Sequence, residues 1–221
     1  MVINTAKTSL RSILFLALLV LSAQALAGSG AILIMGDSLS ASYGVQTERA
    51  WVAQLRERLD SRVEGDWTVV NASISGETTD GGLRRLPDLL SRHQPDIVVI
   101  ELGGNDGLRG FPPGVIENNL ATMIELSQES GARVLLVGMQ MPPNYGPRYT
   151  EAFADIYPDL AEAKETELVP FFLEGIYNQP GMMQDDGIHP TGDAQARLLD
   201  NLWPHLEPML EQTGSRSAQA D

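Results

Sequence analysis

The chain contains 221 residues and has a formal net charge of −14 at pH 7, because 29 acidic residues outnumber 15 basic ones. This charge disfavours nucleic acid and anionic membrane surfaces as partners, since both are themselves negatively charged. The absence of cysteine excludes disulfides, thiolate metal sites, a cysteine nucleophile and a lipid-modified cysteine.

The first 27 residues have the pattern of a secretory signal peptide. Lys7 and Arg11 form a basic region, residues 13–21 are apolar, and an A-x-A cleavage motif ends at Ala27. The apolar stretch is shorter than the about 20 residues that a helix needs to cross a bilayer, which disfavours an uncleaved anchor. We therefore predict cleavage near Ala27, no stable membrane anchoring, and a periplasmic or secreted protein.

Five short apolar segments follow, and each is predicted to be a β-strand. They are rich in Val, Ile and Leu and mostly lack polar/apolar alternation, which is typical of strands buried on both faces of a parallel sheet. Their sequences are AILIM, WTVVN, DIVVIEL, RVLLVGM and LVPFF, at residues 31–35, 67–71, 96–102, 133–139 and 168–172.

Amphipathic segments separate these strands. In residues 48–60, Trp51, Leu55 and Leu59 share one helical stripe, and Thr47 is a suitable N-cap. We expect four further helices, interrupted or bent near Pro87, Pro158 and Pro204, at residues 79–92, 113–130, 148–165 and 192–211.

The alternation of strands and helices predicts one doubly wound α/β domain, over residues 28–212. The polar segment 213–221 is expected to be a disordered tail. In such domains, ligands bind outside the carboxyl ends of the strands. Polar, glycine-rich loops lie at these positions, at residues 36–40, 72–79, 103–106 and 185–190.

These loops contain the residue types of a serine hydrolase. Ser38 would be the nucleophile, His189 its general base, and Asp186, in the same turn, would orient the imidazole. The N–H groups of Ser38 and Gly76 and the side-chain amide of Asn105 would form an oxyanion hole. Each motif alone is more often a turn or a helix cap, so the interpretation depends on their joint order, each after a strand.

Four blocks of the sequence resemble the signature blocks of the SGNH hydrolases, also called GDSL lipases and esterases. The blocks are Gly36-Asp37-Ser38-Leu39, Gly76 within ISGET, Gly103-Gly104-Asn105-Asp106 and Asp186-Gly187-Ile188-His189. The resemblance extends from about Ala31 to Leu199. It implies a flavodoxin-like, three-layer α/β/α sandwich with a five-stranded parallel sheet, and it implies the same site residues: the triad Ser38, His189 and Asp186, and the oxyanion hole with Gly76 and Asn105.

The family resemblance also implies the reaction. It is hydrolysis of small-molecule acyl esters and thioesters through an acyl-enzyme, with no cofactor and no metal. Lysophospholipids, acyl-CoA thioesters and aryl esters are the implied substrate classes. An exported protein would not meet cytoplasmic acyl-CoA, which favours lysophospholipids or exogenous esters.

The segments 104–115 and 139–150 are predicted to contact the acyl chain. Leu108 and Phe111 are expected to be exposed on a mobile apolar flap between glycines, and Tyr145 is expected in an apolar acyl-binding groove. Ordinary loop packing is the alternative for the second segment.

Three acidic residues near the catalytic blocks are interpreted as structural. Asp37 and Asp106 are expected to stabilise their own turns. Asp185 is expected to accept hydrogen bonds within the turn that precedes His189.

Two other functions remain open from sequence. A non-catalytic, exported solute-binding module would use Ser38 and Asn105 only to hold a ligand and would not need His189. A carbohydrate or other small-ester deacetylase would use the same triad on a different substrate. A catalytic metal is disfavoured because no second histidine lies near His189, and the sequence does not indicate an oligomeric state.

Overall fold

The computed structural model describes residues 30–63 and 66–217. Its centre is a sheet of five parallel strands in the order β2-β1-β3-β4-β5, which confirms the predicted sheet. The strands are β1 Gly30–Gly36, β2 Trp67–Asn71, β3 Ile97–Glu101, β4 Arg133–Val137 and β5 Glu167–Val169. The predicted signal peptide, residues 1–27, lies outside the described residues.

The two strands at the β5 side of the sheet are shorter than predicted. β5 ends at Val169, and β4 ends at Val137. Pro170 has no N–H to donate to the sheet, so the segment predicted to continue through Phe172 leaves the ladder there. At Gly138 the chain passes so close to Pro170 that an added Cβ would lie 2.3 Å from its carbonyl oxygen.

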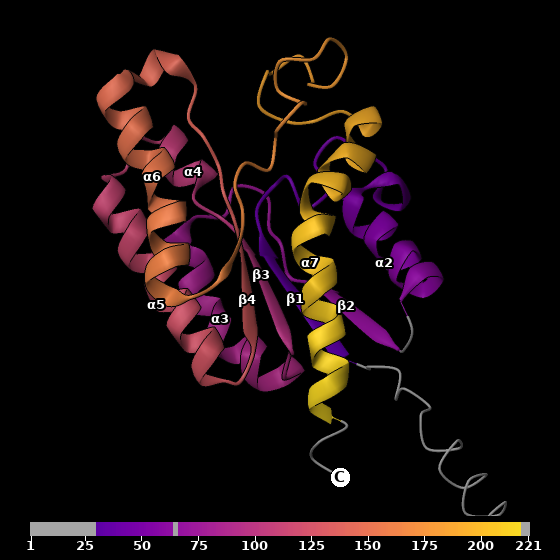
Figure 1. Cartoon of the computed structure of the whole chain (residues 1–221). Coiled ribbons are helices and arrows are strands. Elements are labelled where there is room, and N and C mark those ends of the chain that lie inside the picture. Colours follow the sequence, from indigo (N-terminus) through magenta and orange to yellow (C-terminus); the bar gives the residue numbers. More distant parts are fainter. Residues whose placement is uncertain (1–29, 64–65, 218–221) are drawn as a thin grey trace, which may run out of the picture.

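Helices cover both faces of the sheet, which confirms the three-layer arrangement (Figure 1). On one face α3 packs against α5, and α5 packs against α6; on the other face α2 packs against α7. The α-helices are α2 Trp51–Arg62, α3 Thr79–His93, α4 Gly104–Leu108, α5 Pro113–Glu129, α6 Pro147–Lys164 and α7 Gln195–Ser217. Short 3₁₀ turns are η1 Thr47–Arg49, η2 Pro143–Tyr145 and η3 Gly192–Ala194.

The prediction that Thr47 is the N-cap of the first helix is wrong. Thr47 begins η1, and α2 begins at Trp51. The backbone N–H of Trp51 donates instead to Gln195 Oε1 of α7, at 3.1 Å. A distant side chain therefore satisfies the helix end, which local sequence does not indicate.

Prolines do not end the long helices. α3 continues through Pro87, α6 continues through Pro158, and α7 contains both Pro204 and Pro208. α7 also ends at Ser217, beyond the domain boundary expected at residue 212. Residues 218–221 of the expected tail lie outside the described part of the chain.

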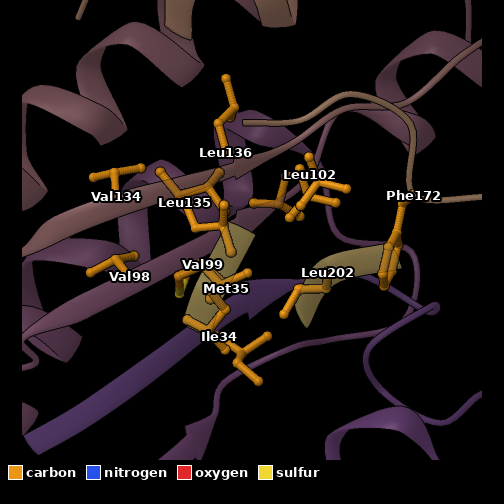
Figure 2. Packing of buried hydrophobic residues seen from close by; sticks show 14 of the residues in the cluster. Ile34, Met35, Val98, Val99, Leu102, Val134, Leu135, Leu136, Phe172 and Leu202 are labelled. Carbon is orange, nitrogen blue, oxygen red and sulfur yellow. The ribbon is translucent and has the colours of Figure 1, made fainter. Parts of the chain in front are cut away.

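Wholly buried aliphatic side chains fill the space between sheet and helices (Figure 2). Every residue of β3 is buried, and β1 is buried from Ile32 to Gly36. Burial of this kind is the main source of stability, at about 25 cal/mol per Å² of apolar surface. It also holds the carboxyl ends of β1 and β3 rigidly side by side, since Gly36 pairs with Glu101. Within the described residues, no helix is long and apolar enough to span a membrane.

Candidate active site

The loop after β1 presents Ser38 beside the loops that follow the other strands. Gly36 ends β1 next to Glu101 of β3, and a Cβ on Gly36 would lie 2.7 Å from the Glu101 carboxylate. The loop after β2 is held against this point by the N–H of Ile74, which donates to the Gly36 carbonyl at 3.1 Å. The predicted convergence of loops at the carboxyl edge of the sheet is therefore found.

Ser38, His189 and Asp186 form a continuous hydrogen-bonded chain. Ser38 Oγ lies 2.9 Å from His189 Nε2, and His189 Nδ1 lies 2.6 Å from Asp186 Oδ2. Ser38 and His189 are 151 positions apart in sequence. This geometry allows the imidazole to accept the serine proton while the carboxylate holds the opposite ring nitrogen.

The turn that holds Asp186 also keeps its carboxylate ionised. Asp186 Oδ1 accepts the backbone N–H groups of His189 and Ile188, at 3.0 and 2.9 Å. These bonds, together with the one to the imidazole, lower the pKa of Asp186 to about 2. Asp185 was expected to accept the hydrogen bonds of this turn, but they go to Asp186 because its side chain points back over the turn.

Gly76 and Asn105, the predicted oxyanion donors, lie in the segment after β2 and in the segment after β3. Gly76 has a φ of +80°, a backbone conformation that glycine adopts readily and that other residues adopt only with strain. This conformation fixes the direction of the Gly76 N–H. Asn105 lies in the first turn of α4, and its Nδ2 donates to Asp37 Oδ2 at 2.8 Å. That bond uses one amide hydrogen and leaves the second for an oxyanion.

Asp37 does more than stabilise its own turn. Its Oδ1 accepts the N–H of Leu39 at 3.0 Å, as expected of a turn residue, while its Oδ2 orients the amide of Asn105. Burial is the largest effect on Asp37 and raises its pKa to about 6, although hydrogen bonds and the His189 charge oppose this shift. Asp37 therefore connects the loop after β1, which carries the predicted nucleophile Ser38 (the nucleophile loop), to the segment after β3, which carries Asn105.

Asp106 was also expected to stabilise its own turn, and here the expectation is wrong. Its carboxylate is completely buried and accepts both the N–H and the hydroxyl of Thr79, at 3.0 and 2.6 Å. Asp106 therefore satisfies the first turn of α3, far away in sequence. A carboxylate near a helix N-terminus is also favoured by the helix dipole.

Comparison with known proteins shows the family of this chain. The model of the GDSL-like lipase/acylhydrolase family matches residues 34–197. The chain belongs to this GDSL family. It is 56% identical over 196 residues to esterase TesA of Pseudomonas aeruginosa strain PAO1, covering 88% of this chain and 96% of that protein.

Two further matches place the GDSL chain among enzymes. It is 47% identical over 197 residues to thioesterase 1/protease 1/lysophospholipase L1 of Escherichia coli K12, covering 89% of this chain and 91% of that protein. A crystal structure of TesA matches with a TM-score of 0.78 and 56% identity, covering 81% of this chain and 99% of that chain. This GDSL-family chain is a serine ester hydrolase, which favours the enzyme over the solute-binding module.

The two apolar side chains predicted to be exposed on the flap of this GDSL chain are not fully exposed. Leu108 and Phe111 are half-buried and pack against the hydrophobic core. The Tyr145 hydroxyl donates to the Leu108 carbonyl at 2.9 Å, and the Tyr149 hydroxyl donates to the Phe111 carbonyl at 2.7 Å. The structure therefore brings Leu108 and Tyr145 together, but through a hydrogen bond that anchors the segment.

Glu101 is a site residue that sequence reasoning missed. It is completely buried, and its Oε2 accepts the N–H of Asp37 at 3.2 Å and the hydroxyl of Ser40 at 2.7 Å. Burial, followed by the nearby charge of Asp37, raises the pKa of Glu101 well above its usual range. An acidic residue within the apolar segment DIVVIEL was the signal available in the sequence.

Replacement of Glu101 by glutamine should change how stability depends on pH. Because the folded-state pKa of Glu101 is raised, unfolding releases its proton above about pH 4.5. Its contribution to stability is therefore fully present below that pH and is lost as pH rises toward the folded-state value. We expect the Tm of Glu101→Gln relative to the parent protein to increase as the pH rises from about 5 to about 8. A Tm difference that stays constant over this range would contradict a raised pKa for the buried Glu101.

Among the described residues, no group of three His, Cys, Asp or Glu side chains is arranged to hold a metal ion.

Proposed function

We propose that this chain hydrolyses acyl esters and thioesters by attack of Ser38 on the carbonyl carbon. As the bond between Ser38 Oγ and the carbonyl carbon forms, the proton of the Ser38 hydroxyl moves to His189 Nε2. The imidazolium then gives that proton to the leaving alkoxide or thiolate as the bond from carbon to the leaving group breaks. The product is released, and an acyl-Ser38 ester remains.

Water completes the reaction in the second half. His189 takes a proton from water as the hydroxide oxygen attacks the acyl carbon, and it returns the proton to Ser38 Oγ when the ester bond breaks. In both halves, Asp186 stabilises the imidazolium, and the Ser38 and Gly76 N–H groups and the Asn105 amide stabilise the oxyanion. The proposal rests above all on the 2.9 Å contact between Ser38 Oγ and His189 Nε2.

Covalent labelling of Ser38 tests this proposal directly. We expect a p-nitrophenyl alkylphosphonate to inactivate the enzyme by attack of Ser38 Oγ on phosphorus, with release of p-nitrophenol. The mass of the alkylphosphonyl group should then be found by mass spectrometry on the peptide that contains Ser38. His189→Ala should slow the labelling because the serine loses its base. Inactivation with label on another peptide would overturn the assignment of the nucleophile.

For substrates, we infer that acyl esters and lysophospholipids fit this chain better than acyl-CoA. The relatives named as an esterase and as a thioesterase and lysophospholipase support an acyl substrate. The N-terminal signal pattern supports a periplasmic or secreted enzyme, and acyl-CoA is a cytoplasmic thioester. A small-ester deacetylase of the same family remains the competing candidate, and acyl-chain length separates the two.

Leu108 is proposed to contact the acyl chain together with Phe111 and Tyr145. Replacing Leu108 by serine should lower kcat/KM for p-nitrophenyl palmitate about tenfold more than for p-nitrophenyl acetate, because a long chain buries more apolar surface. Leu126→Ser is the matched control, since Leu126 on α5 is also a half-buried leucine packed against the core and lies outside both segments. Equal losses on both esters would contradict the contact.

A further inference from the structure

Tyr43 covers one face of the His189 imidazole. The centroids of the two rings are 4.3 Å apart, and the ring planes are inclined by 35°. Tyr43 follows Ser38 by five positions in the nucleophile loop, and half of its surface is exposed. The imidazole therefore has Ser38 at Nε2, Asp186 at Nδ1 and an aromatic face against its plane.

The backbone around Tyr43 holds the ring in this place. Ser42, before it, has a φ of +61°, and Gly44, after it, has a φ of +69°. The N–H of Tyr43 donates to the carbonyl of Ser38 at 3.2 Å. A left-handed serine is uncommon, and such strain persists only where surrounding contacts determine the conformation.

Gln184 fastens the Tyr43 segment to the His189 turn. Its side-chain Nε2 donates to the carbonyls of Tyr43 and Pro190, at 3.0 and 2.9 Å. Its backbone N–H donates to the carbonyl of His189 at 2.8 Å. Gly44 has a φ of +69°, and a Cβ there would lie 2.4 Å from Gln184 Oε1, so a larger residue would strain the backbone and displace the Gln184 side chain. The two loops are therefore joined beside the ring contact.

We propose that Tyr43 is a positioning residue that acts through His189. Its ring keeps the imidazole plane aligned between Ser38 and Asp186, and its π face stabilises the imidazolium that forms during catalysis. The proposal rests on the proposed function, because it requires His189 to be the general base.

Other charged groups also act on the imidazole and must be kept constant in a test. Asp186 contacts Nδ1, and the charge of Asp37 in the nucleophile loop interacts with the ring. Asp185 precedes Asp186 on the exposed side of the turn. Substitution of Tyr43 leaves all three carboxylates unchanged, so a change in pH dependence reports on the aromatic ring.

Tyr43→Leu and Tyr43→Phe form the matched pair for the experiment. Leucine keeps apolar bulk but removes the π face, whereas phenylalanine keeps the face and removes only the hydroxyl. We expect kcat/KM of Tyr43→Leu for p-nitrophenyl acetate to fall about tenfold. The acidic limb of its pH profile should move about 0.5 pH unit lower, because the imidazolium loses stabilisation. Tyr43→Phe should keep the kcat/KM of the parent protein and the position of the acidic limb of its pH profile.

Three results would overturn the proposal for Tyr43. They are an unchanged Tyr43→Leu enzyme, a loss of rate without movement of the acidic limb, and movement of the limb to higher pH. The last would mean that the ring acts by excluding water from the imidazole. A Tm for Tyr43→Leu close to that of the parent protein shows that the rate is measured on folded enzyme. Failure of the proposed function is seen separately, as turnover retained by Ser38→Ala.

Gln184→Ala provides a second variant that keeps the Tyr43 ring. Gln184→Ala loses the two side-chain hydrogen bonds to Tyr43 and Pro190. Its kcat/KM should fall, and the acidic limb of its pH profile should shift to lower pH, as in Tyr43→Leu but by smaller amounts. In the Tyr43→Leu/Gln184→Ala double variant the losses should be less than additive, because both act through one contact. If the losses in kcat/KM of the two single variants add fully in the double variant, Gln184 and Tyr43 act independently. That result would overturn the inference that Gln184 acts by holding Tyr43 against His189.

Discussion

Replacement of Ser38 by alanine is expected to lower kcat for p-nitrophenyl esters about 10⁶-fold, to the level supported by the oxyanion hole and binding alone. Ser38 Oγ lies 2.9 Å from His189 Nε2, and alanine removes this oxygen while keeping Cβ. The residue is only 9% exposed, and alanine is smaller than serine and fits the same space. Stopped-flow and long-time steady-state assays of p-nitrophenol release measure the loss.

Two further variants make the Ser38 test specific. Ser61→Ala changes an exposed serine on α2 and should retain full activity with the same Tm. His189→Ala should cost nearly as much as Ser38→Ala, and the double variant should be no slower than either, because the residues act as a unit. Losses that multiply in the double variant would show that Ser38 and His189 do not share one step.

Replacement of Asn105 by alanine should lower kcat about 10²- to 10³-fold with little change in KM. The reason is that its amide donates most strongly to the negative oxygen of the transition state rather than to the ground-state carbonyl. Asn118→Ala, at an exposed position on α5, is the matched control. A loss below about tenfold would place Asn105 outside the oxyanion hole.

The same prediction extends to Asp37, because it orients the Asn105 amide. In Asp37→Asn one acceptor oxygen is lost, so the amide of Asn105 loses its fixed orientation. The kcat should therefore fall, as in Asn105→Ala, but by a smaller factor.

The effect of Asp37→Asn on stability should have the opposite sign, so the variant should gain stability relative to the parent protein as the pH rises. The pKa of Asp37 is raised to about 6, so the parent protein holds a buried charge above that pH, and the variant does not. A Tm for Asp37→Asn that falls with rising pH relative to the parent would contradict this assignment.

Much of the fold was predictable from local patterns. The core of each strand was found because β1 and β3 are buried on both faces, and such strands are continuously apolar. The boundaries were less accurate where distant residues decide them. Gln195 of α7 satisfies the start of α2. α3 continues through its one proline, Pro87, and packs against α5, which is distant in sequence.

The candidate site was predictable as a set of residue types rather than as a geometry. Gly36-Asp37-Ser38 and Asp186-Gly187-Ile188-His189 each follow a strand, and parallel strands place such loops at one edge of the sheet. The prediction for Leu108 and Phe111 was wrong in exposure, because tyrosine hydroxyls from α6 and η2 hold that segment. A local sequence cannot show hydrogen bonds between residues that are 37 and 38 positions apart.

The sequence by itself determined the parallel sheet, the order of the loops and the chemical identity of Ser38, His189 and Asp186. These features depend on apolar periodicity and on residue types that are read locally. Only the tertiary structure decided which donors the buried carboxylates bind. Asp37 accepts a hydrogen bond from the Asn105 amide, Asp106 accepts one from the Thr79 hydroxyl, and Glu101 accepts one from the Asp37 N–H. The physical reason is that a buried carboxyl must find donors wherever the fold brings them, and these donors come from other strands and helices.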